Sequence, residues 1–279
     1  MTDSEETSIK MTEILVALDH SSHSRAALES AAFIAELMEA KIHGLFVHDN
    51  QWLRISKLSS LSEIDELTGR ISPIGREAVE REIQKLERSI RKHFEIISRQ
   101  HQLPHRWSTE KGEVADKVLE AAENCDIITI GSKGRSYSRT KKLGSTAATI
   151  IRSANKPILI LQKRHNLNYP PIAIFDGSKK SISGLKIAEQ IARRNETHLT
   201  VIDLSKAFPS TEKSGQALAG LKNDTKILQL NQPNMGRFLF MINKLQGGLL
   251  ILPKNERYTR INTIEHILDS ADCPVLLIN

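Results

Sequence analysis

Short runs of apolar residues alternate along the chain with longer segments in which apolar residues recur every three or four positions. The short runs of the first half are rich in Ile, Leu and Val, which is typical of buried strands. They predict strands over residues 14–18, 42–47, 105–110, 126–130 and 157–161. The periodic segments between them predict helices over residues 24–40, 75–101, 113–124 and 145–154. Strands that alternate with helices predict an α/β fold, an open parallel sheet covered by helices on both faces.

The predicted helix 75–101 shows the helical period most clearly. Its apolar residues form one stripe along the helix, whereas Glu and Arg occupy the other positions. The stripe comprises Val79, Ile83, Leu86, Ile90, Phe94 and Ile97. We expect this stripe to pack on the sheet as part of the core. The preceding residues 51–73 have no clear period, and they are interpreted either as a mobile excursion or as a short lid-like helix.

The second half of the chain repeats the unit of the first half. Setting Asp19 over Asp176 aligns apolar positions of the helices that follow, for example Leu28 with Leu185. The predicted strands of this half span residues 171–175, 198–204, 225–230, 248–252 and 274–278, and the helices span 181–194, 235–246 and 261–270. Residues 205–224 are interpreted as a loop, so one helix of the first half is lost or reduced. The sequence therefore predicts two domains, residues 1–165 and a shorter copy over residues 166–279.

The composition is that of an ordinary soluble protein. Of 279 residues, 39% are hydrophobic and 26% are charged, and the net charge is +6. The cations are mixed with Glu along predicted helices and aromatic residues make up only 4%, so we expect no nucleic-acid partner. No apolar run approaches the roughly 20 residues of a membrane span, and the N-terminus is acidic and polar. We therefore expect a cytoplasmic protein without membrane contact.

The cysteines and histidines give no strong metal or disulfide signal. Cys125 and Cys273 each precede an apolar run, where a buried structural thiol is the common role, and the two cysteines alone build neither a disulfide framework nor a zinc site. His20 and His23 lack a third ligand in the local sequence. His43 and His48 lie five residues apart on a predicted strand, so they point to opposite faces and cannot share a metal.

A glycine-containing loop lies between the predicted strand that ends at Ile130 and the helix that begins near Ser145. It contains Gly131, Gly134 and Gly144. Glycines allow backbone N–H groups to approach an oxyanion, and the positive end of the following helix dipole adds to the attraction. Five cations in the loop would neutralise a polyphosphate: Lys133, Arg135, Arg139, Lys141 and Lys142. The spacing matches neither the Walker A loop nor the Rossmann glycine motif, and the plainer alternative is that the glycines only turn the chain.

These motifs resemble the universal stress protein family, in its nucleotide-binding branch. The resemblance rests on Gly131, Gly134, Gly144 and Ser145, on the strand entry at residues 153–160, and on the opening strand that leads to Asp19. It implies two tandem Rossmann-like domains of the adenine nucleotide alpha hydrolase type, each with a five-stranded parallel sheet. It also implies a role in stress adaptation, with ATP, and with Mg²⁺ as its companion ion, as the ligand of the first domain.

The resemblance further assigns the parts of the nucleotide to individual residues. Asp19, with the backbone of Ala17 and Leu18, meets the ribose or adenine, and the main chain at Val47 meets the adenine edge. The loop contacts the ribose and phosphates through Ile130, Gly131, Lys133, Gly134, Gly144, Ser145, Thr146 and Ala147. The Ser145 hydroxyl donates to phosphate or helps to hold Mg²⁺. Asp19 and Ser145 each retain a plainer alternative as helix caps, and Lys133 stands where many members have His.

The second copy has lost the features that would bind phosphate. No glycine remains among residues 253–257, and Ile261 and Asn262 stand where the first copy has Gly144 and Ser145. Asp176, the counterpart of Asp19, persists. The family commonly dimerises through its last strands, so the resemblance implies an internal pseudo-dimer in which residues 158–161 pair with residues 275–278; association into a homodimer stays open.

Three functions remain at the level of sequence. The first is a regulatory module that binds adenine nucleotide and acts on an unknown protein partner. The second is a slow ATPase or phosphotransferase, against which stands the absence of Asp and Glu between Gly131 and Ser153. The third is a structural stress protein that binds no nucleotide.

Overall fold

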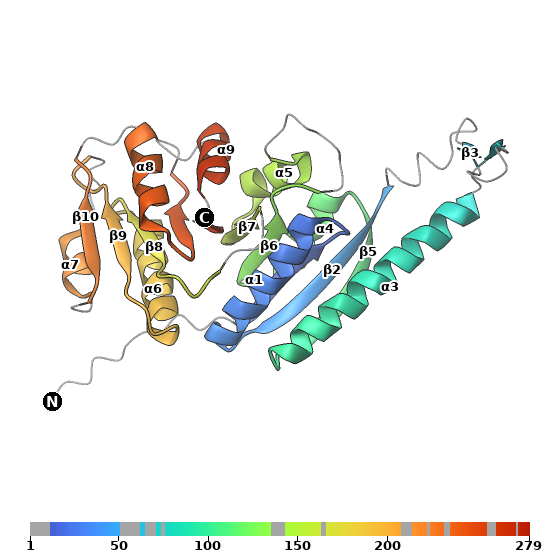
Figure 1. Cartoon of the computed structure of the whole chain (residues 1–279), viewed down its shortest axis with the longest axis horizontal. Helices are drawn as coiled ribbons and strands as arrows, with labels where there is room; N and C mark the ends of the chain where they lie inside the picture. The colour runs from blue at the N-terminus through green and yellow to red at the C-terminus, as the bar shows by residue number, and fades with distance from the viewer. Residues whose placement is uncertain are drawn as a thin grey trace.

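The structure is a computed structural model that describes residues 12–50, 62–64, 71–73, 76–134, 143–162, 166–207, 214–221, 224–231, 235–255, 261–271 and 273–279. A ten-stranded sheet runs through the whole molecule, and helices lie on both of its faces (Figure 1). The α/β fold predicted from the sequence is confirmed.

The first half contributes five neighbouring strands of this sheet. They are Glu13–Leu18 (β1), Lys41–Asp49 (β2), His105–Gly112 (β5), Ile127–Gly131 (β6) and Ile158–Leu161 (β7). The helices of this half are Ser22–Met38 (α1), Arg76–Gln100 (α3), Val114–Ala122 (α4) and Ser145–Ser153 (α5). Every predicted strand and helix of this half is present, within a few residues of its predicted ends.

The second half repeats the arrangement on a smaller scale. Its strands are Ile172–Phe175 (β8), Thr200–Asp203 (β9), Lys226–Gln229 (β10), Leu250–Pro253 (β11) and Val275–Ile278 (β12). Its helices are Lys179–Arg194 (α6), Ser214–Ala219 (α7), Met235–Leu245 (α8) and Ile261–Ser270 (α9). The interpretation of residues 205–224 as a loop was wrong in part, because α7 lies there. This helix is a remnant of the 25-residue α3, since it has only 6 residues.

The two halves join through their last strands. The strand order is β10-β9-β8-β11-β12-β7-β6-β1-β2-β5, and all neighbours are parallel except β7 and β12. This antiparallel pair sets Ile160 opposite Val275 and Ile158 opposite Leu277. Each five-stranded half thus completes the edge of the other, as the predicted internal pseudo-dimer requires. The predicted domain boundary at residues 165 and 166 falls between β7 and β8 and stays a prediction.

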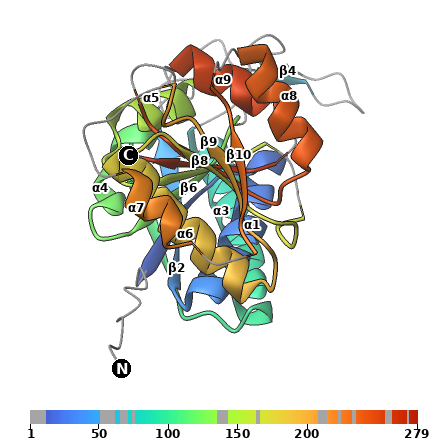
Figure 2. The same ribbon diagram turned by 90° about the vertical axis from the view of Figure 1, so that its left-hand side faces the viewer.

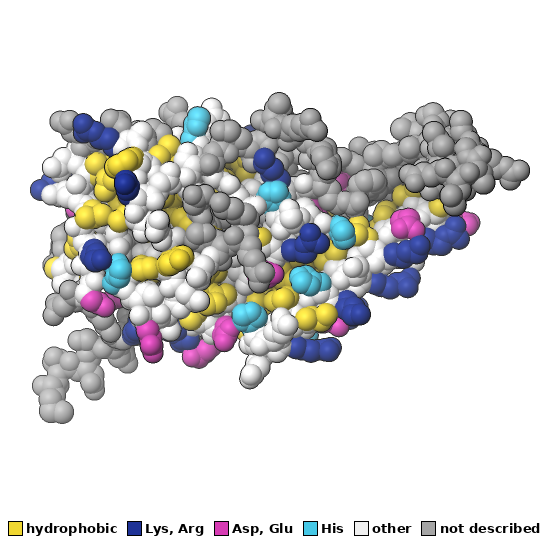
Figure 3. Space-filling model, in the orientation of Figure 1, with side chains coloured by type: hydrophobic (Ala, Val, Ile, Leu, Met, Phe, Trp, Pro, Cys, Tyr) yellow, Lys and Arg dark blue, Asp and Glu magenta, His cyan; other side chains and the backbone are white. Residues whose placement is uncertain are grey.

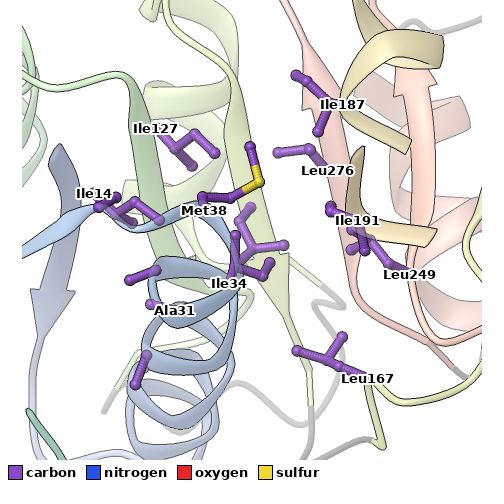
Figure 4. Close-up of a cluster of buried hydrophobic side chains, with 14 of the residues drawn as sticks. Ile14, Ala31, Ile34, Met38, Ile127, Leu167, Ile187, Ile191, Leu249 and Leu276 are labelled. Carbon is purple, nitrogen blue, oxygen red and sulfur yellow. The ribbon is translucent and has the colours of Figure 1, made fainter. Parts of the chain in front are cut away.

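The hydrophobic core continues from one half into the other on both faces of the sheet. On one face α1 packs against α6, and on the other face α5 packs against α9 (Figure 2). Figure 4 shows Ile34 and Met38 of α1 facing Ile187 and Ile191 of α6, with Leu276 of β12 between them. Because these side chains are almost fully buried, the two halves share a hydrophobic layer on this face of the sheet.

Helix α3 lies against β2 and β5 through the apolar stripe predicted from the sequence. Phe94 is fully buried in this contact, and Ile90 is nearly so. The opposite side of the helix is exposed and polar, and Lys and Arg side chains follow one another along it in Figure 3. This face is the solvated surface that the mixed charges of the helix predicted.

The segment before α3 was predicted to be an excursion or a short helix. Its described residues form two short antiparallel strands, Ser62–Ile64 (β3) and Ile71–Pro73 (β4), whereas its other residues lie outside the described ranges. Among the described residues, no helix has the length and apolar character needed to cross a lipid bilayer.

Candidate functional site

The candidate site lies where the chain changes direction in the first half of the sheet. After β1 the chain continues to β2 on one side, and it later returns to β6 on the other side of β1. Ligands of open α/β sheets bind at such a switch point, outside the carboxyl ends of the strands. The parallel pairing of β1 and β6 sets Val16 beside Thr129, so both strands run toward the same edge of the sheet, where Leu18 and Gly131 end them. Val47 follows Phe46, the partner of Leu18, two residues before the end of β2.

Asp19 holds the turn between β1 and α1. Its Oδ1 accepts hydrogen bonds from the backbone N–H of Ser21 at 2.9 Å and from the Ser21 hydroxyl at 2.6 Å. Ser21 is the N-cap of α1, because its Oγ accepts a bond from the N–H of Ser24 at 3.0 Å. The alternative that Asp19 itself caps the helix is therefore wrong. Asp19 supports the capping residue through only one of its two carboxylate oxygens.

The second oxygen of Asp19 faces the glycine loop. Its Oδ2 lies 3.2 Å from the position that a Cβ on Gly134 would occupy. A side chain at position 134 would therefore crowd this oxygen. The absence of a side chain leaves Oδ2 as a hydrogen-bond acceptor at the loop, close to the carboxyl ends of β1 and β6.

Gly131 has a packing role that the sequence did not reveal. A Cβ at this position would lie 2.8 Å from the Cβ of His23 and 3.1 Å from the backbone nitrogen of Ser24, so the first turn of α1 leaves no room for a side chain. Among the described glycines, only Gly112 and Gly177 have positive φ, so none of the three loop glycines is required by a left-handed backbone. The close approach at Gly131 is that of the helix to the strand, and the approach of an anion to the loop backbone stays a prediction.

The N-terminus of α5 has no side-chain cap among the described residues. Gly144 is the N-cap, its N–H donates to the Ser132 carbonyl at 2.8 Å, and the first turn has no acidic residue. The alternative that Ser145 caps the helix is therefore wrong, because Ser145 is the first helical residue and its side chain is exposed. The N–H groups of Ser145, Thr146 and Ala147 form the positive end of the helix dipole, and such groups bind anions.

Ser132 is a buried polar residue of the loop that sequence reasoning missed. It is almost fully buried, and its Oγ has no hydrogen-bond partner among the described residues. Its backbone joins two parts of the site, because its N–H donates to Leu161 of β7 at 2.7 Å and its carbonyl accepts from Gly144. A serine between a glycine and a lysine gives no periodic signal, so only the folded loop singles it out.

His23 and Lys133 add to the electrostatics of this edge. Burial lowers the pKa of His23 below its ordinary value, the positive charge of Lys133 lowers it further, and Asp19 opposes both effects. The net lowering of its pKa favours the neutral imidazole of His23. Lys133 lies next to Gly134 and supplies a positive charge to the loop, and its carbonyl accepts a bond from the Ser21 hydroxyl at 3.4 Å. The four other predicted cations, Arg135, Arg139, Lys141 and Lys142, lie outside the described residues.

The second half repeats the turn at Asp19 with Asp176, but here both carboxylate oxygens accept hydrogen bonds from the protein. Asp176 Oδ1 accepts from the N–H and hydroxyl of Ser178 at 3.0 and 2.6 Å, just as Asp19 does from Ser21. The other oxygen, Oδ2, accepts a 2.8 Å bond from the side chain of Asn255, in the loop that corresponds to the glycine loop. Asp176 is only 2% exposed. A side chain thus occupies the place beside Asp176 that no side chain of the described residues takes beside Asp19.

Comparison with known proteins decides the family of this chain. A model of the universal stress protein family matches residues 11–162, more than half of the 279 residues. The chain belongs to the universal stress protein family. The matched range contains every residue of the candidate site, and the repeated turn at Asp176 extends the same architecture into the second half.

Universal stress proteins of bacteria resemble this chain over different lengths. One from Mycolicibacterium smegmatis is 23% identical over 175 residues, which cover 60% of this chain and 55% of that protein. Universal stress protein G of Shigella flexneri is 45% identical over 53 residues, which cover 18% of this chain and 37% of that protein. The chain thus spans about half the length, or less, of these curated relatives.

The tandem architecture has a counterpart among solved structures. A universal stress protein from Archaeoglobus fulgidus matches 96% of this chain and 98% of its own length, with a TM-score of 0.66 and 16% sequence identity. At this identity the likeness concerns the fold alone. It supports the arrangement of two Rossmann-like halves in one chain.

Proposed function

We propose that the first half of this universal stress protein binds ATP at the carboxyl ends of β1 and β6, and that the protein acts as a regulatory module of the stress response. The observation that carries the proposal is the contrast between the two halves. Asp19 Oδ2 faces the bare Gly134, whereas the equivalent oxygen of Asp176 is occupied by Asn255.

The chemistry of the first half fits a nucleoside triphosphate. A ribose hydroxyl can donate to Asp19 Oδ2, because Oδ1 is already engaged by Ser21. The phosphates can accept from the first-turn N–H groups of α5, which no side chain of the described residues caps. Lys133 supplies positive charge along the same path. Mg²⁺ would be held mainly by the phosphates and water, with the exposed Ser145 hydroxyl as a protein ligand.

The remaining predicted contacts belong to the ends of the strands. Ala17, Leu18, Ile130 and Gly131 offer main-chain groups beside Asp19, and the main chain at Val47 is the predicted contact for the adenine edge. Thr146 and Ala147 lie in the first turn of α5 and are assigned to the terminal phosphates. In this proposal the bound nucleotide biases the choice of a protein partner in the cytoplasm, and the second half serves as the internal dimer partner.

A conservative substitution tests the proposal without disturbing the turn. In Asp19→Asn the remaining oxygen can still accept from Ser21, whereas the group in place of Oδ2 becomes a donor. Losing one acceptor for a buried hydroxyl costs about 1–3 kcal/mol, so we expect ATP affinity to fall about 10- to 100-fold. The affinity is measured by titration calorimetry with ATP, ADP and AMP, and a phosphate-release assay measures turnover.

Asp176→Asn is the matched control, because it makes the same change in the closed half. We expect it to leave ATP affinity unchanged and the stoichiometry at one nucleotide per chain. Equal binding by wild type and Asp19→Asn, or loss of binding in Asp176→Asn alone, would contradict the proposal.

A further inference from the structure

A cluster of possible metal ligands lies at the edge of the sheet opposite to the candidate nucleotide site. It consists of Glu13, His43 and Cys125, whose ligand atoms all lie within 4.8 Å of one another. Glu13 begins β1, His43 lies near the beginning of β2, and Cys125 lies between α4 and β6. The amino ends of neighbouring parallel strands therefore bring together three residues that are far apart in the sequence.

Two of the three side chains are buried and the third leads to solvent. His43 is 2% exposed and Cys125 is 1% exposed, whereas the side chain of Glu13 is 15% exposed. The backbone around Glu13 is held in place, because Asp126 Oδ2 accepts hydrogen bonds from the N–H groups of Thr12 and Glu13 at 2.6 and 3.1 Å. These hydrogen bonds fix the backbone that carries the Glu13 ligand. The partial exposure of the Glu13 side chain gives an ion a route from solvent to the cluster.

The His43 ring has one nitrogen engaged and one without a partner. Nε2 lies 2.7 Å from the hydroxyl of Ser108 on β5, whereas Nδ1 is buried and has no hydrogen-bond partner among the described residues. Ser108 lies on β5, on one side of β2, whereas Glu13 lies on β1, on the other side. A metal-bound histidine characteristically donates its second N–H to such a group, which orients the ring. A buried, unpartnered nitrogen is costly unless a ligand uses its lone pair.

The guanidinium of Arg106 balances the negative charge of Glu13 in this structure. Its guanidinium forms an ion pair with Glu13, and its side chain is 51% exposed. Arg106 lies on β5 directly beside His43, so it competes with a metal ion for Glu13. Since half of its surface faces water, the guanidinium can move outward when another cation occupies the cluster.

We propose that Glu13, His43 and Cys125 form a binding site for a thiophilic divalent cation of the Zn²⁺ class. A thiolate, an imidazole and a carboxylate are the donor types that Zn²⁺ prefers, whereas Mg²⁺ and Ca²⁺ prefer oxygen donors alone. The two anionic ligands balance the charge of the ion, which suits a largely buried position. Tetrahedral Zn²⁺ needs ligand atoms about 3.4–3.8 Å apart, so side-chain movements of about 1 Å would complete the geometry. A water molecule fills the fourth position.

The site joins the beginning of β1, the beginning of β2 and the turn before β6. An ion there would stabilise the amino edge of the first half, far from the loop assigned to ATP. The exclusion of a zinc site from the sequence rested on the two cysteines alone, and it did not include Glu13 and His43 as ligands beside Cys125. The proposal is independent of nucleotide binding, because none of its residues belongs to the nucleotide site.

Cobalt provides a spectroscopic test with the full chain. The protein is treated with a chelator and titrated with Co²⁺, and then with Zn²⁺ in competition. We expect a thiolate-to-cobalt charge-transfer band in the near ultraviolet, the intense visible bands of tetrahedral Co²⁺, and their loss as Zn²⁺ displaces Co²⁺. Cys125→Ser should abolish the charge-transfer band and weaken Co²⁺ binding at least about tenfold. Arg106→Gln should tighten binding, because it removes the competing cation.

Cys273→Ser is the matched control, since Cys273 is the other cysteine and lies outside the cluster. It should retain the full Co²⁺ spectrum. If Cys125→Ser does not fold, Glu13→Gln provides the second test, with the same expected loss of affinity. The proposal is overturned if Co²⁺ gives no charge-transfer band, if the band survives in Cys125→Ser, or if Arg106→Gln binds Co²⁺ more weakly than wild type.

Discussion

The side chain of Asn255 donates a 2.8 Å hydrogen bond to Oδ2 of Asp176, one of the most deeply buried carboxylates of the protein. The equivalent oxygen of Asp19 faces a glycine. The repeat has therefore kept the aspartate in both halves and changed only what faces it. In the second half the carboxylate accepts a hydrogen bond from a side chain of the protein, and in the first half no side chain of the described residues takes that place.

Removing the Asn255 side chain, which donates to Asp176, should destabilise the protein without creating a second nucleotide site. In Asn255→Ala the carboxylate loses a buried hydrogen bond, which costs about 1–3 kcal/mol. Nucleotide stoichiometry should remain one, because Pro253 still stands where the first half has Gly131. Urea unfolding followed by circular dichroism measures the loss, and Asn262→Ala, an exposed asparagine of α9, is the control. A second bound nucleotide in Asn255→Ala would contradict this account.

The loop glycines should differ in their tolerance of a methyl group. A Cβ at Gly131 would lie 2.8 Å from His23, whereas a Cβ at Gly144 would meet its nearest neighbour at 3.5 Å, an ordinary contact. Gly131→Ala should therefore lose about 1–3 kcal/mol of stability through overpacking, and Gly144→Ala should lose much less. Thermal unfolding of the two variants shows whether Gly131→Ala lowers the melting temperature more than Gly144→Ala does. Equal melting temperatures would show that α1 does not pack as closely on β6 as the structure indicates.

Lys254 of the second half should stabilise helix α5 of the first half. Its Nζ donates to the carbonyls of Ile151 and Arg152, at 2.8 and 3.3 Å, near the C-terminus of α5. A cation at this position satisfies terminal carbonyls and is favoured by the helix dipole. Lys254→Met should lower the free energy of unfolding by about 1–2 kcal/mol, whereas the exposed Lys226→Met should have little effect. The prediction fails if both variants unfold at the same urea concentration as wild type.

Glu87 should contribute to stability above mildly acidic pH and lose this contribution in acid. Burial alone would raise its pKa, but hydrogen bonds from Thr109, His48 and Trp107, together with the charge of His48, lower the pKa below the ordinary 4.5. Two of these contacts measure 2.6 Å, from Thr109, and 2.9 Å, to His48. The pKa of Glu87 is lower in the folded protein than in the unfolded chain. The carboxylate therefore contributes its full stabilisation at pH values above the unfolded pKa, and the contribution is lost as the pH falls through the folded pKa.

The measurement for Glu87 is urea unfolding at several pH values between 7 and 3. Glu87→Gln should be less stable than wild type at pH 7, and the difference should shrink below about pH 4.5 as the wild-type carboxylate becomes protonated. Glu95→Gln is the control, since Glu95 pairs with Arg91 and Arg99 on the exposed side of α3, where ion pairs contribute little. A constant difference between wild type and Glu87→Gln at all pH values would contradict the prediction.

The order of strands and helices followed from the sequence because it depends on local pattern. The apolar run Ile127–Ile130 forms a buried strand, and the stripe that contains Phe94 forms a helix face of the predicted length. The repeat and the lost glycines of the second half also followed from the order of residues, whereas the pairing of the last strands was implied by the family resemblance. The helix α7 was missed, because six residues in a polar segment give too little period to identify.

The tertiary structure decided how residues distant in the sequence use their functional groups. No pattern along the chain reveals that Oδ1 of Asp19 is engaged by Ser21 and Oδ2 faces Gly134, or that Asn255 closes the equivalent place beside Asp176. The same holds for Glu13, His43 and Cys125, since their proximity results from the pairing of strand ends. Local sequence determines elements through short-range sterics and hydrophobic period, whereas a site depends on distances between elements, and these are set only when the core packs.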